Sequence, residues 1–331
     1  MYKFVLIIAL LFVSCSYTDK KPANEKLISS FEEINVLIGL PGSMSVYGDY
    51  LIIDNWTDDG KLLEFVDINS GTSVRRCINR GDGPADLLDP IDFKVRGDSL
   101  LCLSRRVSKF KMYSIPNLLS SDSLRCNPMD FGRFDRFTSS SKGYFFFGPG
   151  KADGLSFYSS AGNFVNTLPL FPEYDDKMKN ESLMYRMKQG FFDVSDDGRY
   201  LAFGGSFLGV LKFYEINADG SYGLLQNIEF DHRMQDKIND KGENVVIDQS
   251  DLDHCWDVQY FNGAFYVQYN GLPMSDTSSM SSILKYSEDG QLQSCYKFRF
   301  PLVSFCMKDE NSAFGISKNN DGDYILVRFS L

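Results

Sequence analysis

The chain has 331 residues, of which 43% are hydrophobic, and it carries a formal net charge of −10 at pH 7. The hydrophobic fraction supports a buried core, and the length suffices for one large all-β domain or two ordinary ones. The negative charge, without a large Lys/Arg cluster, argues against nucleic acid as a partner and against attachment to anionic lipid through a basic segment. Aromatic residues make up 15% of the chain, a composition that favours β-strands.

The N-terminal segment predicts export and a lipid anchor. Lys3 gives the start a positive charge, and residues 4–13 form an unbroken apolar run that is too short to span a bilayer as a stable helix. A small residue then precedes Cys15, as in a bacterial lipobox. We therefore expect a lipoprotein signal peptide over residues 1–14, lipidation of Cys15 and a flexible polar tether over residues 15–26. The alternative is an ordinary signal peptide with an unrelated cysteine at its end.

A short pattern recurs six times along the rest of the chain, where a tight polar turn is followed by an apolar or aromatic run. The second residues of the six turns are Asp49, Asp98, Gly143, Gly198, Gly263 and Asn311. The spacings between them are 49, 45, 55, 65 and 48 residues. Turns of this kind between β-rich runs predict hairpins.

Each repeat provides four strands when the strand before its first turn is counted. In the first repeat, residues 62–66 form a strand that leads to a second turn, and residues 72–78 form the last strand. In the second repeat, residues 115–117 are expected to form the second turn. Four-stranded units of about 40–50 residues are typical of β-propellers. We predict an all-β fold, a six-bladed β-propeller over residues 27–331, with five or seven blades or a large sandwich as alternatives. The sixth repeat lacks its outer strand, and residues 27–36 are expected to supply it and close the ring.

All long connections of this propeller are expected on one face, here called the long-loop face, and the short turns on the opposite hairpin face. The long connections are residues 79–90, 169–190, 231–253 and 270–281. Long loops in compact domains are often functional. We therefore predict that the long-loop face binds a ligand or a protein partner, with neutral variation in loop length as the alternative. Residues 181–189 are expected to form a short helix packed on the propeller.

Residues 80–87, with the sequence Arg-Gly-Asp-Gly-Pro-Ala-Asp-Leu, resemble a motif of a known family. Lipoproteins with TolB-like six-bladed propellers, abundant in Bacteroides-type bacteria, carry a G-x-G-P-x-E-aromatic pattern in the first inter-blade loop. Three residues match it, namely Gly81, Gly83 and Pro84. Asp86 replaces the usual Glu, and Leu87 replaces the usual aromatic residue. The resemblance implies the fold and a cell-envelope location, but the family offers no catalytic residues to carry over.

Catalytic and metal-binding patterns are weak. The chain has two histidines, and the H-E-x-x-H and G-x-S-x-G motifs are absent. Asp248, Asp251 and Asp253 can offer oxygen ligands to Ca²⁺ or another divalent metal, although solvated loop side chains are the simpler interpretation. We predict no catalytic residue and no cofactor, with a divalent metal as the alternative. The six cysteines after Cys15 lie in apolar segments and are expected to be buried thiols, although an oxidising compartment permits disulfides.

Three arginines fall in connections of the long-loop face. Arg80, Arg105 and Arg106 can hold a carboxylate or a sugar acid bidentately, or they can pair with neighbouring aspartates such as Asp82. Trp56 lies in the first connection of the same face, where its indole can stack on a sugar ring or cover a blade edge. These five residues are the candidate ligand-binding set.

The resulting functional prediction is a monomeric binding or scaffold protein, anchored by lipid in the cell envelope and assigned to the outer membrane. Its partner is a ligand or a protein on the long-loop face. The alternative is a propeller enzyme, a lactonase or lyase that acts on a carbohydrate derivative with a divalent metal.

Overall fold

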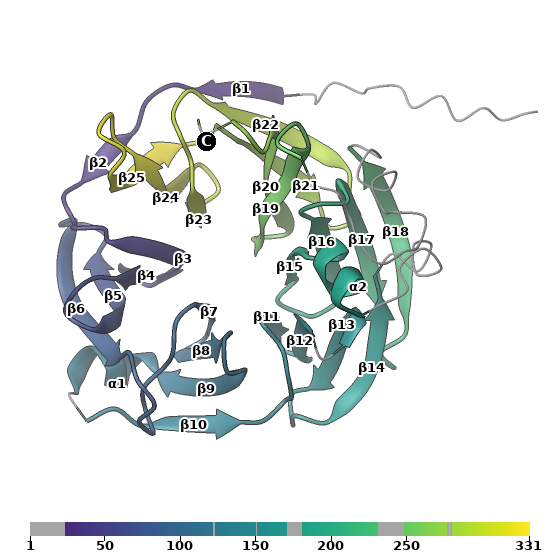
Figure 1. The fold of residues 1–331 in the computed structure, drawn as a ribbon, viewed down its shortest axis with the longest axis horizontal. Coiled ribbons are helices and arrows are strands. Elements are labelled where there is room, and N and C mark those ends of the chain that lie inside the picture. Colours follow the sequence, from purple (N-terminus) through teal and green to yellow (C-terminus); the bar gives the residue numbers. More distant parts are fainter. Residues whose placement is uncertain are drawn as a thin grey trace, which may run out of the picture.

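The structure is a computed structural model that describes residues 24–331 except residues 122, 150, 171–180, 231–247, 277 and 279. The predicted signal peptide, Cys15 and the tether up to residue 23 lie outside the described residues. Six sheets surround a central axis, with the first strand of each blade innermost and the last at the rim (Figure 1). The predicted six-bladed β-propeller of four-stranded blades is therefore confirmed.

The first three blades follow one another in chain order. Blade one consists of β3 (Leu40–Tyr47), β4 (Tyr50–Trp56), β5 (Lys61–Asp67) and β6 (Thr72–Asn79). Blade two consists of β7 (Ile91–Arg96), β8 (Ser99–Ser104), β9 (Lys109–Ser114) and β10 (Cys126–Met129). Blade three consists of β11 (Arg136–Ser140), β12 (Gly143–Gly148), β13 (Lys151–Ser159) and β14 (Phe164–Pro169).

The second half of the ring repeats this order and ends on a blade completed from the N-terminus. Blade four consists of β15 (Gly190–Val194), β16 (Tyr200–Gly205), β17 (Val210–Ile216) and β18 (Tyr222–Glu229). Blade five consists of β19 (Leu252–Phe261), β20 (Ala264–Pro273), β21 (Ser282–Ser287) and β22 (Leu292–Phe298). Blade six consists of β23 (Ser304–Asp309), β24 (Ser312–Lys318), β25 (Tyr324–Ser330) and β2 (Glu32–Ile34).

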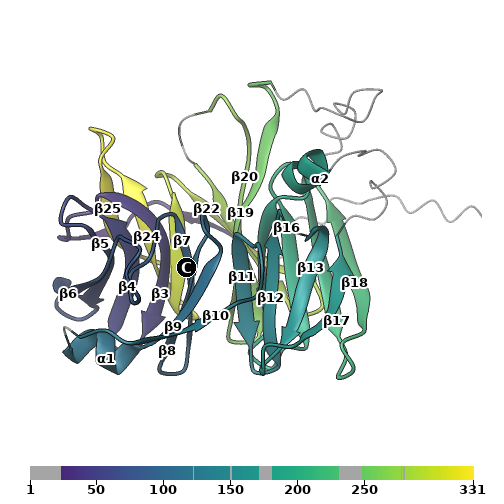
Figure 2. The ribbon, with the colours of Figure 1, turned by 60° about the horizontal axis from the view of Figure 1, so that its bottom comes forward.

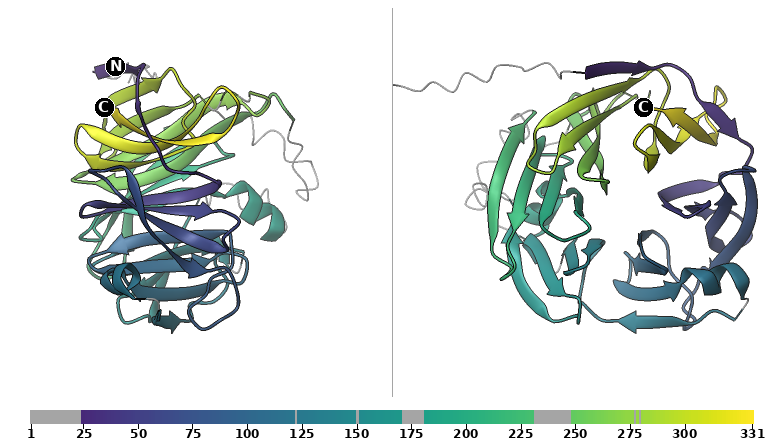
Figure 3. Two further views of the ribbon diagram at one scale, coloured as in Figure 1. Left: turned by 90° about the vertical axis from the view of Figure 1, so that its left-hand side faces the viewer. Right: turned by 180° about the vertical axis from the view of Figure 1, so that it is seen from behind.

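The N-terminal segment closes the ring and joins two blades. β2 pairs antiparallel with β25, which confirms the predicted closure. β1 (Asn24–Ile28) pairs parallel with β22 as a fifth strand of blade five, and Figure 3 shows both purple strands along the rim. The predicted tether boundary at residue 26 was therefore wrong, because residues 24–26 already pair with the open edge of β22. The Lys26 ammonium also donates to the Leu331 carbonyl over 2.7 Å, so the two ends of the described chain are tied together.

Two helices lie in connections. α2 (Glu181–Met187) is the expected helix, and Leu183 and Met187 are buried against the propeller. α1 (Ile115–Ser120) stands where a tight turn was predicted. Ser114 caps its N-terminus by accepting a hydrogen bond from the Asn117 amide, a local arrangement that starts a helix. Among the described residues, neither helix has the length and apolar character needed to cross a membrane.

The core consists of apolar clusters between neighbouring blades. Phe110 of β9 packs edge-on against Phe137 of β11 and Phe146 of β12, with ring centroids 4.9 and 5.7 Å apart. Edge-to-face aromatic pairs of this kind add about 0.5–1.5 kcal/mol each to the burial of their surface. The six cysteines of the propeller are free thiols and all except Cys126 are buried, as expected.

The two faces of the ring differ in loop length as predicted, with one exception: the connection between β9 and β10, which contains α1, is long and lies on the hairpin face. Figure 2 shows α2 and the far end of β20 on one face, and the hairpin that joins β7 to β8 on the other. The hairpin between β19 and β20 turns at Asn262 and Gly263, with φ of 46° and 80°. Two successive positive φ angles match the twist of paired strands, which explains why Asn-Gly marks this turn.

Candidate functional site

A cavity of about 590 Å³ runs along the propeller axis. Its lining comes from the innermost strand of every blade and includes residues at both ends of these strands. The volume is in the range of sites that enclose small molecules. The lining carboxylates are Asp54, Asp89, Asp92, Asp193, Asp196 and Asp257, and the lining cations are Lys94, Arg105, Arg136 and Lys308.

Two arginines meet the cavity at its long-loop end. Arg105 directly follows β8, and its Nη2 lies 3.9 Å from a carboxylate oxygen of Asp135, while its Nε is buried without a hydrogen-bond partner. Arg136 is the first residue of β11, and its guanidinium lies over the ring of Phe191, 3.9 Å from the centroid. No described residue forms an ion pair or hydrogen bond with the Arg136 guanidinium. Donors on both arginines therefore remain available.

Two carboxyl groups at this end have a raised pKa. Burial raises the pKa of Asp54 to about 8, and the charges of Asp89 and Asp92 act in the same direction. Enclosure in the channel also raises the pKa of Asp92, against the opposing influence of Arg136. Burial and the nearby Arg105 lower the pKa of Arg136. Asp54 thus keeps its proton to a higher pH than an exposed aspartate does, although the nearby Arg105 lowers its pKa.

A glycine makes room for Asp54 in the channel wall. A Cβ atom at Gly42 of β3 would overlap the Asp54 carboxyl oxygen. The register between β3 and β4 shifts between Pro41 and Met44, at the same place. The irregular strand and the missing side chain let the carboxyl enter the wall, where burial keeps its proton.

At the hairpin end of the cavity two charged residues form an ion pair. The ammonium of Lys94 lies 3.1 Å from the Asp193 carboxylate, which also accepts hydrogen bonds from the Thr138 hydroxyl and from the Tyr260 amide. Burial raises the pKa of Asp257 to about 6, although Lys94 lowers it. This end therefore stabilises the ring and leaves fewer groups free for a ligand.

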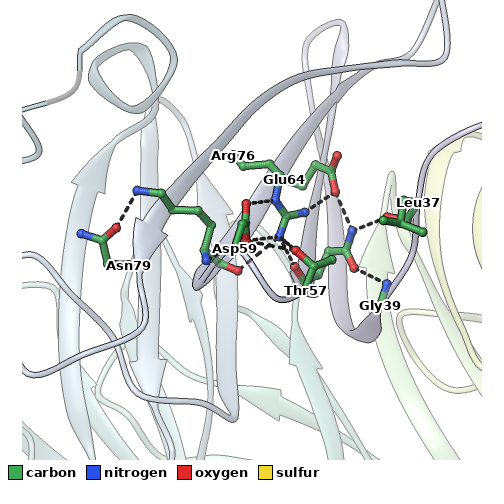
Figure 4. Close-up of polar contacts among 9 residues, drawn as sticks. Leu37, Gly39, Thr57, Asp59, Glu64, Arg76 and Asn79 are labelled. Atoms are coloured by element: carbon green, nitrogen blue, oxygen red, sulfur yellow. Dashed lines mark hydrogen bonds and ion pairs between the residues drawn. The ribbon is translucent and has the colours of Figure 1, made fainter.

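Trp56, the last residue of β4, lines the cavity, and its indole is contacted by an arginine that does not line it. The guanidinium of Arg80 lies over its indole, 4.5 Å from the centroid, and pairs with Asp89. The loop after Trp56 is fixed by Arg76, which binds Asp59 and Glu64 at 2.7 Å each (Figure 4). This network positions the indole at the long-loop end.

The structure brings together part of the predicted ligand-binding set. Trp56 and Arg105 line the cavity, and Arg80 contacts Trp56 from outside the lining. Arg106 is exposed and does not line the cavity, and Asp82 is an exposed side chain 4.0 Å from Lys109. The predicted cluster of three arginines at one cavity is therefore reduced to Arg105.

Sequence reasoning missed the charged residues of the innermost strands. They are Asp92, Lys94, Arg136, Asp193 and Asp257. Each lies in the strand that precedes the first turn of a repeat, where a charged residue is unusual in an otherwise apolar pattern. That recurrence was a signal available in the sequence.

The loop with the family-like motif has a structural role in this fold. The buried ammonium of Lys111 donates to the carbonyls of Gly83 and Pro84 at 3.2 and 2.9 Å and to that of Asp86 at 2.5 Å. The Asp86 carboxylate accepts from the Gly83 amide at 3.2 Å. The loop thus satisfies a buried cation with backbone oxygen atoms.

The candidate metal ligands are spread over a turn and the start of β19. The Asp248 amide donates to the carboxylate of Asp251 at 2.8 Å, and Asp248 itself accepts from the Ser250 amide. Asp253 lies in β19, where burial raises its pKa. Within the described part of the chain, no group of three or more His, Cys, Asp or Glu side chains is arranged to hold a metal ion.

Solved structures share this fold. The structure of a "Putative exported protein" from Bacteroides fragilis matches 93% of this chain and 99% of its own length, with a TM-score of 0.61 and 10% identity. A member of the duf4221 family from Bacteroides vulgatus matches 94% and 98%, with a TM-score of 0.55 and 12% identity. The calcium-binding protein regucalcin from Agrobacterium tumefaciens matches 93% and 95%, with a TM-score of 0.51 and 9% identity.

These similarities establish the propeller and nothing finer, because all three identities are far below those that carry function. No protein-family model and no curated protein matches the chain. Membership of the TolB-like lipoproteins therefore stays a prediction from the motif at residues 80–87.

Proposed function

We propose that this chain is an exported, lipid-anchored binding protein that takes a small ligand into its axial cavity from the long-loop face. The observation that carries the proposal is a cavity of about 590 Å³ whose long-loop end presents unsatisfied arginine donors beside Trp56. A cavity with a few convergent polar groups is the usual form of a small-molecule site. The proposed anchor is Cys15 in the outer membrane, and the name of the Bacteroides fragilis structure supports an extracytoplasmic location.

The lining favours binding over covalent catalysis. No histidine lines the cavity, and none of its serines is hydrogen-bonded to a general base among the described residues. Nucleophilic catalysis by serine needs such a base. A metal-dependent lactonase or lyase remains the second candidate from the sequence, and it requires a divalent ion that metal analysis of the purified protein would find at one equivalent.

The proposal is tested by a thermal-shift screen of the mature protein against sugars, sugar acids, amino acids and short peptides. We expect at least one compound to raise Tm, because a ligand that binds only the folded state stabilises it. Ser45→Phe places a ring in the cavity lining and should abolish the shift. Ser73→Phe on β6, an exposed outer position of the same blade, is the matched control. A panel without any stabilising compound, or an unchanged shift in Ser45→Phe, would contradict the proposal.

A further inference from the structure

We infer that Arg105 and Arg136 form a recognition site for a carboxylate group of the ligand at the long-loop end of the cavity. This inference rests on the proposed function and adds the chemical class of the ligand. Arg105 and Arg136 are far apart in the sequence. The sequence suggested Arg80 and Arg106 as partners of Arg105, but Arg136 is the arginine that lines the cavity with it.

Arg136 offers the more open of the two guanidinium groups. Its face lies over Phe191 at 3.9 Å from the ring centroid, and no described residue accepts a hydrogen bond from it. Stacking through the face holds the plane of a guanidinium while its N–H edge stays free for a planar, bidentate acceptor. A carboxylate is such an acceptor.

Arg105 makes one long contact with Asp135, and both side chains keep a polar atom without a hydrogen bond. Its Nη2 lies 3.9 Å from Asp135 Oδ2, an oxygen that already accepts from the Tyr185 hydroxyl. Arg105 Nε and Asp135 Oδ1 are buried without hydrogen-bond partners. Two guanidinium groups that share one cavity also repel each other, and an anion between them relieves this repulsion.

Three acidic groups of the cavity already have partners, which weakens their attraction for a cationic ligand. Asp89 pairs with Arg80, and Asp92 accepts from the Phe137 amide at 3.2 Å. Asp193 is bound by Lys94 and by two hydrogen-bond donors. At the long-loop end the groups left without partners include N–H donors of both arginines, which favours an anionic ligand.

A monoanion fits this environment better than a dianion such as phosphate. The carboxylates of Asp89 and Asp92 line the same end of the cavity as the two arginines, so each added negative charge meets further repulsion. Trp56 offers an aromatic surface against which the rest of the ligand can pack, and this suits both sugar rings and short peptides. The shared chemistry is a carboxylate on a small, partly apolar body.

Titration calorimetry with defined probes tests the inference. The probes are D-glucuronate against D-glucose, N-acetyl-dialanine against its C-terminal amide, and inorganic phosphate. We expect one carboxylate to bind about tenfold or more tightly than its neutral counterpart and than phosphate, because charge-assisted hydrogen bonds are the strong ones. The pair that shows the difference identifies a sugar acid or a peptide carboxylate as the source.

Variants assign the effect to the arginines. Arg136→Gln and Arg105→Gln should each weaken binding of that carboxylate about tenfold or more. Arg133→Gln, an exposed position three residues before Arg136, is the matched control and should bind like the wild type. Arg136→Lys keeps the positive charge but lacks the planar, bidentate guanidinium, and it should bind the carboxylate more weakly than the wild type. It replaces Arg136→Gln as the test if the glutamine variant fails to fold.

Four results would overturn the inference, and the first three concern probes that bind. These three are equal binding of the neutral counterparts, tighter binding of phosphate, and full affinity in Arg136→Gln. Lack of binding by every carboxylate probe would overturn it as well. If neutral compounds bind and Ser45→Phe abolishes their binding, the proposed function stands while the carboxylate site fails.

Discussion

Lys94 and Asp193 form an ion pair between blades that are not neighbours. The ammonium nitrogen of Lys94 on β7 lies 3.1 Å from the carboxylate of Asp193 on β15. The same carboxylate accepts from Thr138 of blade three and from the Tyr260 amide of blade five. One side chain thus connects four of the six blades at the axis.

We predict that Asp193→Ala lowers the free energy of unfolding by about 3–5 kcal/mol, because it removes the direct ion-pair partner of the Lys94 ammonium inside the channel. Urea denaturation measures the change. Asp196→Ala, at an exposed position in the hairpin that follows β15, is the control and should stay within about 0.5 kcal/mol of the wild type. Adding Lys94→Met to Asp193→Ala should recover part of the loss, and a double variant no better than the single one would contradict the pairing.

The second prediction concerns Asp54 and pH. Burial raises its pKa to about 8, whereas an unfolded chain releases this proton near pH 4. The stabilisation by the proton is therefore complete below about pH 4 and is lost as the pH rises toward 8. We expect the free energy of unfolding of the wild type to fall, relative to Asp54→Asn, by up to about 1.4 kcal/mol per pH unit between about pH 5 and 7.

A pH series of urea denaturation curves measures this slope. Asp67→Asn in the β5–β6 hairpin is the control with the opposite sign, because hydrogen bonds from Ser70 lower the pKa of Asp67. Its stabilisation is present above the usual pKa and is lost as the pH falls. Parallel stability curves for the wild type and Asp54→Asn would show that Asp54 is ionised in the folded protein.

The third prediction concerns the network behind Trp56. Arg76→Leu removes the ion pair to Glu64, whose side chain is 4% exposed, and leaves a buried carboxylate with Asn55 as its remaining partner. We expect a loss of about 3 kcal/mol in thermal or urea unfolding. Adding Glu64→Gln should restore part of it. Arg199→Leu removes the exposed pair with Glu215 and should cost less than about 1 kcal/mol, so equal losses in the two arginine variants would argue against the buried pair.

The fourth prediction tests ring closure. Deleting residues 16–23 should leave Tm almost unchanged, because the deletion keeps every strand pairing of the described residues, the first of which is at Asn24. Deleting residues 16–36 removes β1 and β2, exposes the edges of β22 and β25, and should lower Tm by many degrees. Similar Tm values for the two deletions would show that the closing strands contribute little.

The fifth prediction tests the anchor. Cys15→Ala should move the protein from the membrane fraction to the soluble fraction, because no other lipid attachment is expected. Its Tm should match that of the wild type. Retention in the membrane fraction after a high-salt wash would refute lipidation at this residue, and Ser16→Ala is the control that should stay membrane-bound.

The repeat pattern alone determined the number of blades. A turn such as Asn262-Gly263 depends on φ and ψ of its own two residues, so the signal is local and readable in the sequence. The same holds for α2, whose buried Leu183 and Met187 follow helical spacing. One failure was local, because the cap at Ser114 that starts α1 was read as a tight turn. The other depends on a contact distant in the chain: β1 pairs with β22 near the opposite end, and no local pattern specifies that partner.

The candidate site was only partly determined by sequence. Trp56 and Arg105 were identified because chain order puts them at the long-loop ends of β4 and β8. Arg136 became a partner of Arg105 only when blades two and three packed around the axis. The raised pKa of Asp54 likewise depends on burial and on Asp89 and Asp92, which a sequence does not bring together. Short-range turn geometry set the blades, and closure of the ring decided which charged side chains share the cavity.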